Sequence, residues 1–421
     1  MHFVHVVQMY HPVTSGSVKF FVELGQQLVR GGHRVTILTT TAAELEAFWL
    51  PSKNEYPAVT ETHLGTTIIR FPIRRFAPHP LIYPIMRRLL VELGRLRCPV
   101  NLMRWLSALT PRTPQLTDWI ITNSADIDVI HVTNVTLDGL IHPVIDAAER
   151  AGIPVIATPF IHLGEATDAS LVRYYEMPQQ LDILHRSRAV FVMTARERRF
   201  VVGHGVSDAL VHVVGAGVTP TEVIGGNGAS FRDSHQVSGP IILQIGAMAR
   251  DKGTLTTIDA MRVLWQKGSD ASLVLIGAPL EHFVTAFAAL PNDIRRRIVL
   301  LAHASDDDKR DALAAAALLV LPSRTDSFGI VFLEAWCNQL AVIGADAGGI
   351  PDVIADGVDG LLVPFDDRER LATAIESLLA DPARAHQYAT AGMEKVARLY
   401  TWDAIGAAMV PVCVAAGTPR V

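Results

Sequence analysis

With 421 residues, the chain is long enough for two or three domains, and its 49% hydrophobic and 19% charged residues are typical of a globular protein with a large core. A net charge of −5 at pH 7 excludes attraction of the whole molecule to nucleic acid. The three cysteines, Cys98, Cys337 and Cys413, are widely spaced, which excludes a disulfide framework and a zinc spacing and favours a reducing compartment.

The first residues, MHFVHVVQMYHP, lack the basic region and the long apolar stretch of a secretory signal. No apolar run reaches the roughly 20 residues that a membrane-spanning helix needs. We therefore expect a cytoplasmic protein, either soluble or held peripherally on the inner face of a membrane.

Short apolar runs alternate with amphipathic stretches along most of the chain. Residues 3–7 predict a buried strand, and residues 17–32 predict a helix that ends at Gly31-Gly32. Further strands are predicted at 33–40, 127–133, 154–158, 189–194 and 211–214. Continuous apolar strands separated by helices are typical of a parallel sheet that is covered on both faces.

The apolar pattern stops between residues 219 and 239, which are rich in Gly, Ser, Thr and Asn and predict a linker. Strands resume at 240–247, 271–278, 297–302, 318–323 and 340–345. The α/β chain is therefore divided into four parts: a Rossmann-like domain (1–222), a linker (223–238), a second Rossmann-like domain (239–398) and a C-terminal helix (399–421). We expect the C-terminal helix to close over either half. Two such parallel sheets facing each other across a cleft bind ligands outside the carboxyl ends of their strands.

The stretch LLVLPSRTDSFGIVFLEAWC combines a strand, a polar turn and a helix that is expected to begin near Phe328. Asp326 then lies just ahead of the helix, where an aspartate is favoured. The free N–H groups of Phe328, Gly329 and Ile330 attract a phosphate or sugar hydroxyls. Glu334, one turn in, accepts two hydrogen bonds from a vicinal diol such as ribose. Alternatively, Asp326 only caps the helix and Glu334 is a paired surface charge.

Residues 322–363 resemble the signature region of glycosyltransferase family 4, which contains retaining enzymes of the GT-B fold that use nucleotide-sugar donors. The family pattern begins with an acid, Phe-Gly two residues later and a Glu eight residues after the acid, which match Asp326, Phe328-Gly329 and Glu334. It continues with a Gly-Gly-x-Pro loop, matched by Gly348–Pro351, and a Gly-Leu-Leu-Val strand, matched by Gly360–Val363. The resemblance implies that Asp326 and the backbone from Phe328 to Ile330 contact the donor sugar, and that Glu334 holds the ribose. The first acid is usually Glu in the family.

Residues 244–261 resemble the phosphate-binding turn of the same family. Gly246, Lys252 and Gly253 match its Gly-Arg-x-x-x-x-Lys-Gly pattern, whereas Ala247 occupies the arginine position. The resemblance implies that Lys252 binds the pyrophosphate, and Arg250 is a candidate replacement for the missing arginine. The alternative for Lys252 is a solvated lysine at a helix start, where the helix dipole disfavours a cation unless an anion lies nearby.

Two stretches of the N-terminal half also resemble this family. Residues 9–38 are similar to its opening strand, glycine loop and helix, and Gly16 in that loop lets the backbone approach a diphosphate. Residues 154–168 are similar to a region whose histidine lies against the donor sugar, which makes His162 a candidate and Glu165 a weaker candidate for acceptor binding. A lone histidine is also compatible with a structural role.

The stretch from Arg70 to Arg112 carries nine arginines and one acid, interleaved with apolar residues that include Phe76, Leu81 and Trp105. Residues 84–97 and 99–109 each predict a helix with an apolar side and an arginine side. Such a surface binds anionic lipid headgroups. A solvated helix pair packed on its own domain and a basic cleft for a phosphorylated acceptor are the alternatives.

The resemblance implies a hexosyltransferase that moves a sugar from a UDP- or GDP-sugar to an acceptor hydroxyl of a glycolipid, polysaccharide or small-molecule glycoside. Asp326 and His162 would orient the sugar, and no metal or other cofactor is expected. The acidic stretch ASDDDKRDAL fits a helix start at Ser305 better than a metal site. The rival hypotheses are a non-catalytic protein that binds nucleotide-sugars, supported by Ala247, Ser17 and the aspartate at 326, and an epimerase or phosphorylase of the GT-B fold.

Overall fold

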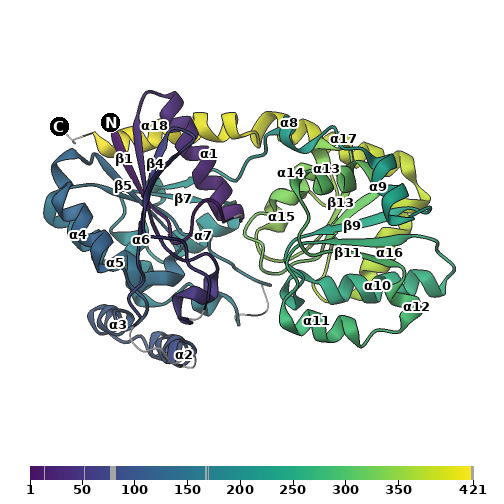
Figure 1. The fold of residues 1–421 in the computed structure, drawn as a ribbon, viewed down its shortest axis with the longest axis horizontal. Helices are drawn as coiled ribbons and strands as arrows, with labels where there is room; N and C mark the ends of the chain where they lie inside the picture. The colour runs from purple at the N-terminus through teal and green to yellow at the C-terminus, as the bar shows by residue number, and fades with distance from the viewer. Residues whose placement is uncertain (14, 52, 76–81, 166–167, 169, 419–421) are drawn as a thin grey trace. The chain divides into compact units, whose positions relative to one another are not determined.

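The computed structural model describes residues 1–13, 15–51, 53–75, 82–165, 168 and 170–418. The chain forms two compact units. Unit 1 comprises residues 1–161, 170–215 and 405–421, and unit 2 comprises residues 162–169 and 216–404. Each unit is built on one sheet with helices on both of its faces (Figure 1).

Unit 1 contains an eight-stranded sheet in the order β3-β4-β2-β1-β5-β6-β7-β8. Its strands are β1 (His2–Val6), β2 (Arg34–Thr40), β3 (Thr60–His63), β4 (Thr66–Phe71), β5 (Val129–Thr133), β6 (Val155–Thr158), β7 (Ala189–Val192) and β8 (Val211–Val213). Its helices are α1 (Gly16–Arg30), α2 (Ile82–Arg95), α3 (Val100–Ser107), α4 (Pro114–Thr122), α5 (Asp138–Ala151), α6 (Pro178–His185) and α7 (Ala195–Gly203). Every strand pair is parallel except β3 with β4, which is antiparallel.

Unit 2 contains a six-stranded parallel sheet in the order β11-β10-β9-β12-β13-β14. Its strands are β9 (Ile241–Ile245), β10 (Ser272–Ile276), β11 (Ile298–Leu301), β12 (Leu318–Leu321), β13 (Ala341–Ala345) and β14 (Leu361–Val363). Its helices are α8 (Pro220–Val223), α9 (Gly228–His235), α10 (Thr254–Gln266), α11 (Glu281–Ala288), α12 (Asn292–Arg295), α13 (Asp306–Ala315), α14 (Ile330–Cys337), α15 (Ile350–Val353), α16 (Arg368–Ala380) and α17 (Pro382–Leu399).

The strands predicted from apolar runs are all present, to within a few residues at their ends. They form because strands of a parallel sheet are buried on both faces and therefore read as continuous apolar sequence. The hairpin β3–β4 was not predicted. Strand β3 reads Thr-Glu-Thr-His and contains no apolar residue, so no apolar run marks this edge hairpin in the sequence. Leu64 and Gly65, both with a positive φ, form the turn between its two strands.

The predicted linker, 223–238, contains a helix instead of irregular chain. Asn227 caps α9 by accepting a hydrogen bond from the N–H of Ser230, and Phe231 is buried. The glycines that suggested a linker serve close packing, because a Cβ on Gly226 would lie 2.1 Å from the carbonyl oxygen of Arg310 and one on Gly228 would lie 2.6 Å from that of Ala314. Composition alone does not separate this use of glycine from flexibility.

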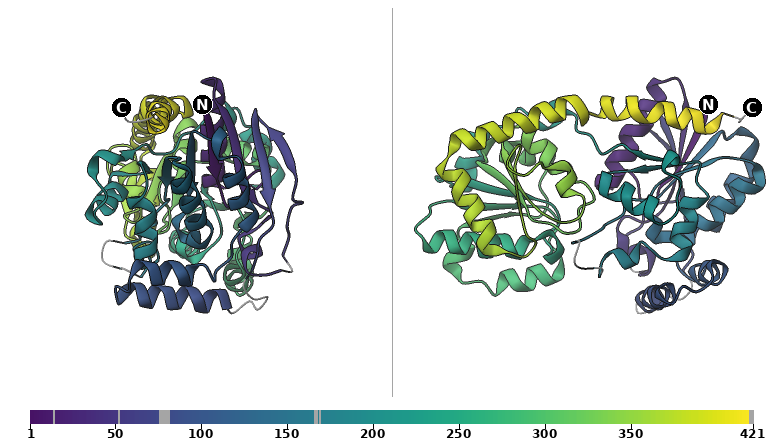
Figure 2. Two further views of the ribbon diagram at one scale, coloured as in Figure 1. Left: turned by 90° about the vertical axis from the view of Figure 1, so that its left-hand side faces the viewer. Right: turned by 180° about the vertical axis from the view of Figure 1, so that it is seen from behind.

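The C-terminal helix α18 (Trp402–Gly417) contributes residues to both units. Its last part belongs to unit 1, where Gly417 lies against Met1 and Val129, so the two ends of the described chain are side by side (Figure 2). At its start, Trp402 is buried in unit 2 beside Gly217. The helix expected to close over either half therefore contributes residues to both units.

Candidate functional site

The predicted donor-site residues of unit 2 follow the two central strands of its sheet. Strand β9 begins a series that continues outward through β10 and β11, whereas β12 begins a series that continues in the opposite direction through β13 and β14. Lys252 lies in the turn after β9, and Asp326 lies in the turn after the adjacent strand β12. These turns therefore meet at the topological switch point, where open parallel sheets bind their ligands.

Lys252 and Asp326 form an ion pair with 2.9 Å between Nζ and Oδ2. Burial raises the pKa of Asp326, but Lys252, the Ser323 hydroxyl and His162 together outweigh burial and hold this pKa below its usual value. The pair keeps some access to solvent, with 24% of the lysine side chain and 19% of the aspartate side chain exposed. A carboxylate that stays ionised here can accept hydrogen bonds from sugar hydroxyls, and Nζ keeps donors for a second anion.

His162 belongs to unit 2 and couples electrostatically to both members of this pair. Burial and the charge of Lys252 outweigh the opposing effects of Asp326 and the backbone at Thr325, and together they lower the pKa of His162 to about 4. The imidazole is therefore neutral near pH 7 and offers one donor and one acceptor. The structure thus brings His162, Lys252 and Asp326 together, as expected for residues around one sugar.

Two glycines allow the site's turns to approach one another. Gly253 has φ +68°, and a Cβ there would lie 2.3 Å from the carbonyl oxygen of Pro322 in the turn after β12. Gly348 has φ +59°, and a Cβ there would lie 2.4 Å from the carbonyl oxygen of Asp326, which also accepts a hydrogen bond from the N–H of Gly349 at 2.9 Å. The Gly-Gly-x-Pro loop therefore holds the backbone of Asp326.

Gly348→Ala is expected to destabilise the protein by at least about 2 kcal/mol, because it combines left-handed strain with the clash against Asp326. Gly357→Ala is the matched control: its φ is +72°, but no atom lies within 4 Å of the added Cβ, so only strain of about 1–2 kcal/mol is expected. Urea denaturation of both variants measures the difference. Equal losses of unfolding free energy would contradict the close approach.

Helix α14 begins at Ile330 with Gly329, φ +90°, as its N-cap, and no side chain caps it. The alternative in which Asp326 only caps the helix is therefore wrong, because Gly329 is the N-cap and Lys252 engages the carboxylate of Asp326. The first N–H groups of a helix have no intrahelical partner, so this end retains donors for a ligand. Phe328 is buried and meets Tyr400 edge to face with 5.2 Å between ring centroids, which fixes the entry into the helix.

Glu334 lies one turn into α14, and its side chain is 10% exposed. Its Oε1 atom accepts a hydrogen bond from Lys309 of α13 at 2.6 Å. Its Oε2 atom is buried and has no hydrogen-bond partner within the described part of the chain. An ionised carboxylate oxygen without a partner is costly in the free protein, and a ligand hydroxyl would satisfy it.

Arg324 was missed by the sequence reasoning, although it stands in the same turn two residues before Asp326. Its Nε atom donates to Asp251 at 2.8 Å, and its Nη1 atom lies 3.4 Å from Asp168 and 3.6 Å from Glu165. It therefore fastens the segment that carries His162 to the turns after β9 and β12. Glu165, predicted as a weaker acceptor-binding candidate, is part of this ionic cluster.

Arg250 of unit 2 and Gly16 of unit 1 are two further candidates for donor binding, and their roles stay predictions. Arg250 is exposed, its N–H donates to Nε2 of His282 at 2.9 Å, and its carbonyl oxygen accepts from the N–H of Gly253 at 2.9 Å. Gly16 belongs to unit 1, where it is the first residue of α1 behind the capping side chain of Ser15. Among the described residues, no group of three or more His, Cys, Asp or Glu side chains is arranged to hold a metal ion.

Glu197 of α7 anchors the chain immediately before His162. Its two carboxylate oxygens accept hydrogen bonds from the N–H groups of Ile161 at 2.8 Å and Met193 at 2.6 Å. Burial nevertheless raises the pKa of Glu197 from 4.5 to about 7. The folded protein therefore binds a proton more tightly at this carboxyl than the unfolded chain does.

This raised pKa predicts a pH dependence of stability. The contribution is complete below pH 4.5 and is lost as the pH rises through about 7. The unfolding free energy of the wild type minus that of Glu197→Gln is expected to fall over this window, by on the order of 3 kcal/mol. Urea denaturation at mildly acidic and mildly alkaline pH measures it, with the exposed Glu176→Gln as control. A difference that stays constant with pH would contradict the prediction.

Solved structures share this fold over nearly the whole chain. The Anabaena protein Alr3699/HepE in complex with UDP and glucose superposes with a TM-score of 0.72, covering 99% of this chain and 100% of its own, at 16% identity. Sucrose-phosphate synthase from Thermosynechococcus elongatus superposes with a TM-score of 0.70, covering 98% of each chain, at 20% identity. The protein therefore has the GT-B fold, in which two Rossmann-like units form one chain.

The sequence matches two domain families, "Glycosyl transferase 4-like domain" over residues 15–217 and "Glycosyl transferases group 1" over residues 229–395. Alpha-maltose-1-phosphate synthase from Mycolicibacterium smegmatis is 35% identical over 175 residues, which are 39% of this chain and 44% of the relative. D-inositol 3-phosphate glycosyltransferase from Xylanimonas cellulosilytica is 27% identical over 286 residues, 63% of this chain and 67% of the relative. The chain belongs to glycosyltransferase family 4, although it spans less than half the length of the first of these relatives.

Proposed function

We propose that the protein is a retaining hexosyltransferase that transfers a sugar from a UDP- or GDP-sugar to an acceptor hydroxyl. The observation that carries the proposal is the Lys252–Asp326 pair at the switch point, with the unpartnered Oε2 atom of Glu334 farther along the same segment. These groups match the three parts of the donor. Asp326 and His162 would bind the sugar, Lys252 would bind the diphosphate, and Glu334 would bind the ribose. Family membership and the UDP-bound structure of Alr3699/HepE support this assignment.

In the proposed reaction, the bond from the anomeric carbon to the diphosphate breaks while a bond to the acceptor oxygen forms on the same face. The acceptor proton passes to the departing diphosphate oxygen. Lys252 and the N–H groups at the start of α14 stabilise the negative charge that develops on the leaving group. Asp326 and His162 hold the sugar and do not form a covalent bond to it, so no protein nucleophile is required.

Thermal-shift measurements against a panel of UDP- and GDP-sugars test donor binding, and NMR of the product tests the anomeric configuration. We expect one nucleotide-sugar to raise the melting temperature and the product to keep the donor's configuration. Absence of any shift, or an inverted product, would overturn the corresponding part of the proposal. Tight donor binding without release of nucleoside diphosphate would favour the non-catalytic alternative.

We further propose that helix α2 binds an anionic membrane surface. Ile85 is 62% exposed and Leu96, just after the helix, is 75% exposed. Arg88 and Arg97 are exposed and form no ion pair in the described part of the chain. The basic surface is smaller than the sequence predicts, because five of the nine arginines are bound to acids within unit 1: Arg70 to Glu61, Arg75 to Glu55, Arg87 to Asp138, Arg95 to Glu92 and Arg104 to Asp146. Phe76 and Leu81 lie outside the described residues.

Vesicles that contain anionic lipid are expected to pellet the protein at low salt and release it at high salt, because each exposed arginine near the surface contributes about 1 kcal/mol. Arg88→Glu combined with Arg97→Glu should abolish pelleting, whereas Arg296→Glu on unit 2 should not. Pelleting that does not depend on lipid charge would remove the proposal. No helix among the described residues is both long and apolar enough to cross a bilayer.

A further inference from the structure

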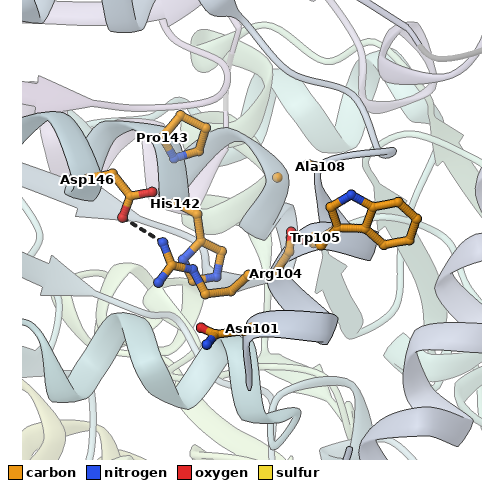
Figure 3. Close-up of a pocket in the computed structure, with 9 residues that line it drawn as sticks. Asn101, Arg104, Trp105, Ala108, His142, Pro143 and Asp146 are labelled. Carbon is orange, nitrogen blue, oxygen red and sulfur yellow. Dashed lines mark hydrogen bonds and ion pairs between the residues drawn. The ribbon is translucent and has the colours of Figure 1, made fainter. Parts of the chain in front are cut away.

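Unit 1 contains a pocket between α3 and α5 that none of the proposed donor contacts uses. It has a volume of about 350 Å³ and is lined by residues of both helices, including Asn101, Arg104, Trp105, His142 and Asp146 (Figure 3). Small-molecule sites typically enclose about 300–1,000 Å³, so the pocket is large enough for a small ligand. Its lining mixes one large aromatic ring with planar polar groups.

The charges in and behind the pocket neutralise one another. Arg104 donates to Asp146 at 2.6 Å and lies 3.7 Å from Asp182. Arg186, behind it, donates to the same Asp146 at 2.7 Å and to Glu149 at 2.6 Å. Both guanidinium groups already have carboxylate partners, so the pocket holds no spare positive charge for a phosphate. This balance favours a neutral ligand that has many hydroxyl groups.

His142 supplies a second observation that points to a polar ligand. It lines the pocket and is only 4% exposed. Its Nδ1 atom lies 4.0 Å from Oδ2 of Asp182 and the backbone of Gln179 faces the ring, but neither ring nitrogen has a partner at hydrogen-bond geometry among the described residues. Burial lowers its pKa to about 4, with Arg104 and Arg186 adding to the shift, so the ring is neutral and carries one donor and one acceptor. Buried polar groups without partners are rare and costly, and a ligand hydroxyl would satisfy this one.

Trp105 and Asn101 lie one turn apart on α3 and present an apolar plane beside an amide. Trp105 is 63% exposed despite its size, and Figure 3 shows it on the opposite side of the pocket from Asp146. A pyranose ring has one face of C–H groups that packs on an aromatic plane and an edge of hydroxyls that requires planar polar partners. The pocket provides both kinds of group.

We propose that this pocket binds a neutral saccharide, with its ring on Trp105 and its hydroxyls bonded to Asn101, Asp146 and His142. The inference goes beyond the proposed transfer reaction, because the pocket is lined by residues of unit 1 and by none of the residues proposed to hold the donor. A lipid surface is the competing occupant for an exposed tryptophan, but an apolar chain would leave the buried His142 and the amide of Asn101 without hydrogen-bond partners.

Isothermal titration of the full chain with methyl α-glucoside, methyl α-mannoside, methyl α-galactoside and maltose tests the site, with inorganic phosphate as the anionic probe. We expect saturable binding of at least one saccharide, with a Kd on the order of 1 mM, and none of phosphate. Trp105→Ala and Asn101→Ala should each weaken saccharide binding at least tenfold. Leu102→Ala is the matched control, because Leu102 is exposed on the same helix and does not line the pocket.

The proposal is overturned if no saccharide binds, if phosphate binds more tightly, if Trp105→Ala and Leu102→Ala behave alike, or if Trp105→Ala impairs only vesicle binding. Donor binding is measured by thermal shift on the same preparations, with Glu334→Ala as the donor-site variant. Absence of saccharide binding to the wild type, together with an intact response to nucleotide-sugars, would refute this inference alone. Saccharide binding that persists without any response to nucleotide-sugars would refute the proposed function instead.

Discussion

Lys252→Ala is expected to weaken binding of the nucleotide-sugar at least tenfold, which corresponds to about 1.4 kcal/mol. The lysine is the cation that the switch point of unit 2 provides next to Asp326, and a diphosphate bound there requires a positive partner. Turnover should fall further than affinity, because negative charge on the leaving group grows as the sugar departs. Calorimetry and measurement of released nucleoside diphosphate give the two quantities separately.

The same substitution should change how the site responds to acid. Burial raises the pKa of Asp326, and Lys252 is the largest influence that lowers it, so the variant's carboxyl should take up a proton at higher pH than in the wild type. His162 also loses a neighbour that depresses its pKa. Residual donor binding by Lys252→Ala is therefore expected to weaken as the pH falls over a range in which the wild type is unaffected.

Two variants separate charge from packing in this prediction. Lys252→Arg keeps a cation and should recover part of the affinity, although a planar guanidinium does not reproduce a compact ammonium. Lys267→Ala removes an exposed lysine of the same unit that pairs with Glu376 at 2.7 Å, and it should leave donor binding unchanged. Unchanged affinity in folded Lys252→Ala would show that the lysine only neutralises Asp326.

The alternation of strands and helices was predictable because each central strand is buried on both faces and reads as an apolar run. The edge strand β3 and the helix α9 were not predicted. Strand β3 lies at the sheet edge and carries a polar sequence, and α9 is hidden by glycines that permit its close approach to α13. In both cases the tertiary environment, and not local preference, decides the conformation.

The resemblance to family motifs points to Lys252, Asp326 and Glu334 as candidate site residues, but it does not identify their partners. Lys252 and Asp326 stand 74 positions apart, and only the adjacency of β9 and β12 in the sheet brings them together. For the same reason, composition and periodicity do not predict that Lys309 pairs with Glu334. Nor do they predict that Arg324 forms ion pairs with the segment that carries His162.

The arginine-rich stretch shows the opposite error, because its sequence alone overstates how much unpaired positive charge the surface carries. Residues 70–112 contain a single acid, so the segment reads as strongly basic. The neutralising carboxylates come from elsewhere in unit 1, including Glu55, Glu61 and Asp138. A count of charge within one segment omits partners from other segments, and therefore only the unpaired exposed arginines remain as candidates for lipid binding.

Glu334→Ala is likewise expected to weaken binding of the nucleotide-sugar at least tenfold, because it removes both carboxylate oxygens proposed to hold the ribose. The Oε2 atom, buried and without a partner in the described chain, is the oxygen that a ribose hydroxyl would satisfy. Hydrogen bonds to a charged acceptor contribute about 1.5–3 kcal/mol each, so losing one accounts for the tenfold change and losing two for more. Calorimetry on the folded variant measures the loss.

The ion pair with Lys309 provides a way to separate ribose binding from structural support. Lys309→Ala removes the 2.6 Å contact but leaves the carboxylate, so it should cost less donor affinity than Glu334→Ala. A donor that carries 2′-deoxyribose offers a sharper comparison, because it lacks one of the two hydroxyls. If Glu334 binds the diol, the penalty of Glu334→Ala should shrink with the deoxy donor, as expected when both partners of one hydrogen bond are removed. An equal penalty with both donors would place Glu334 in a purely structural role and leave the ribose without a protein ligand in α14.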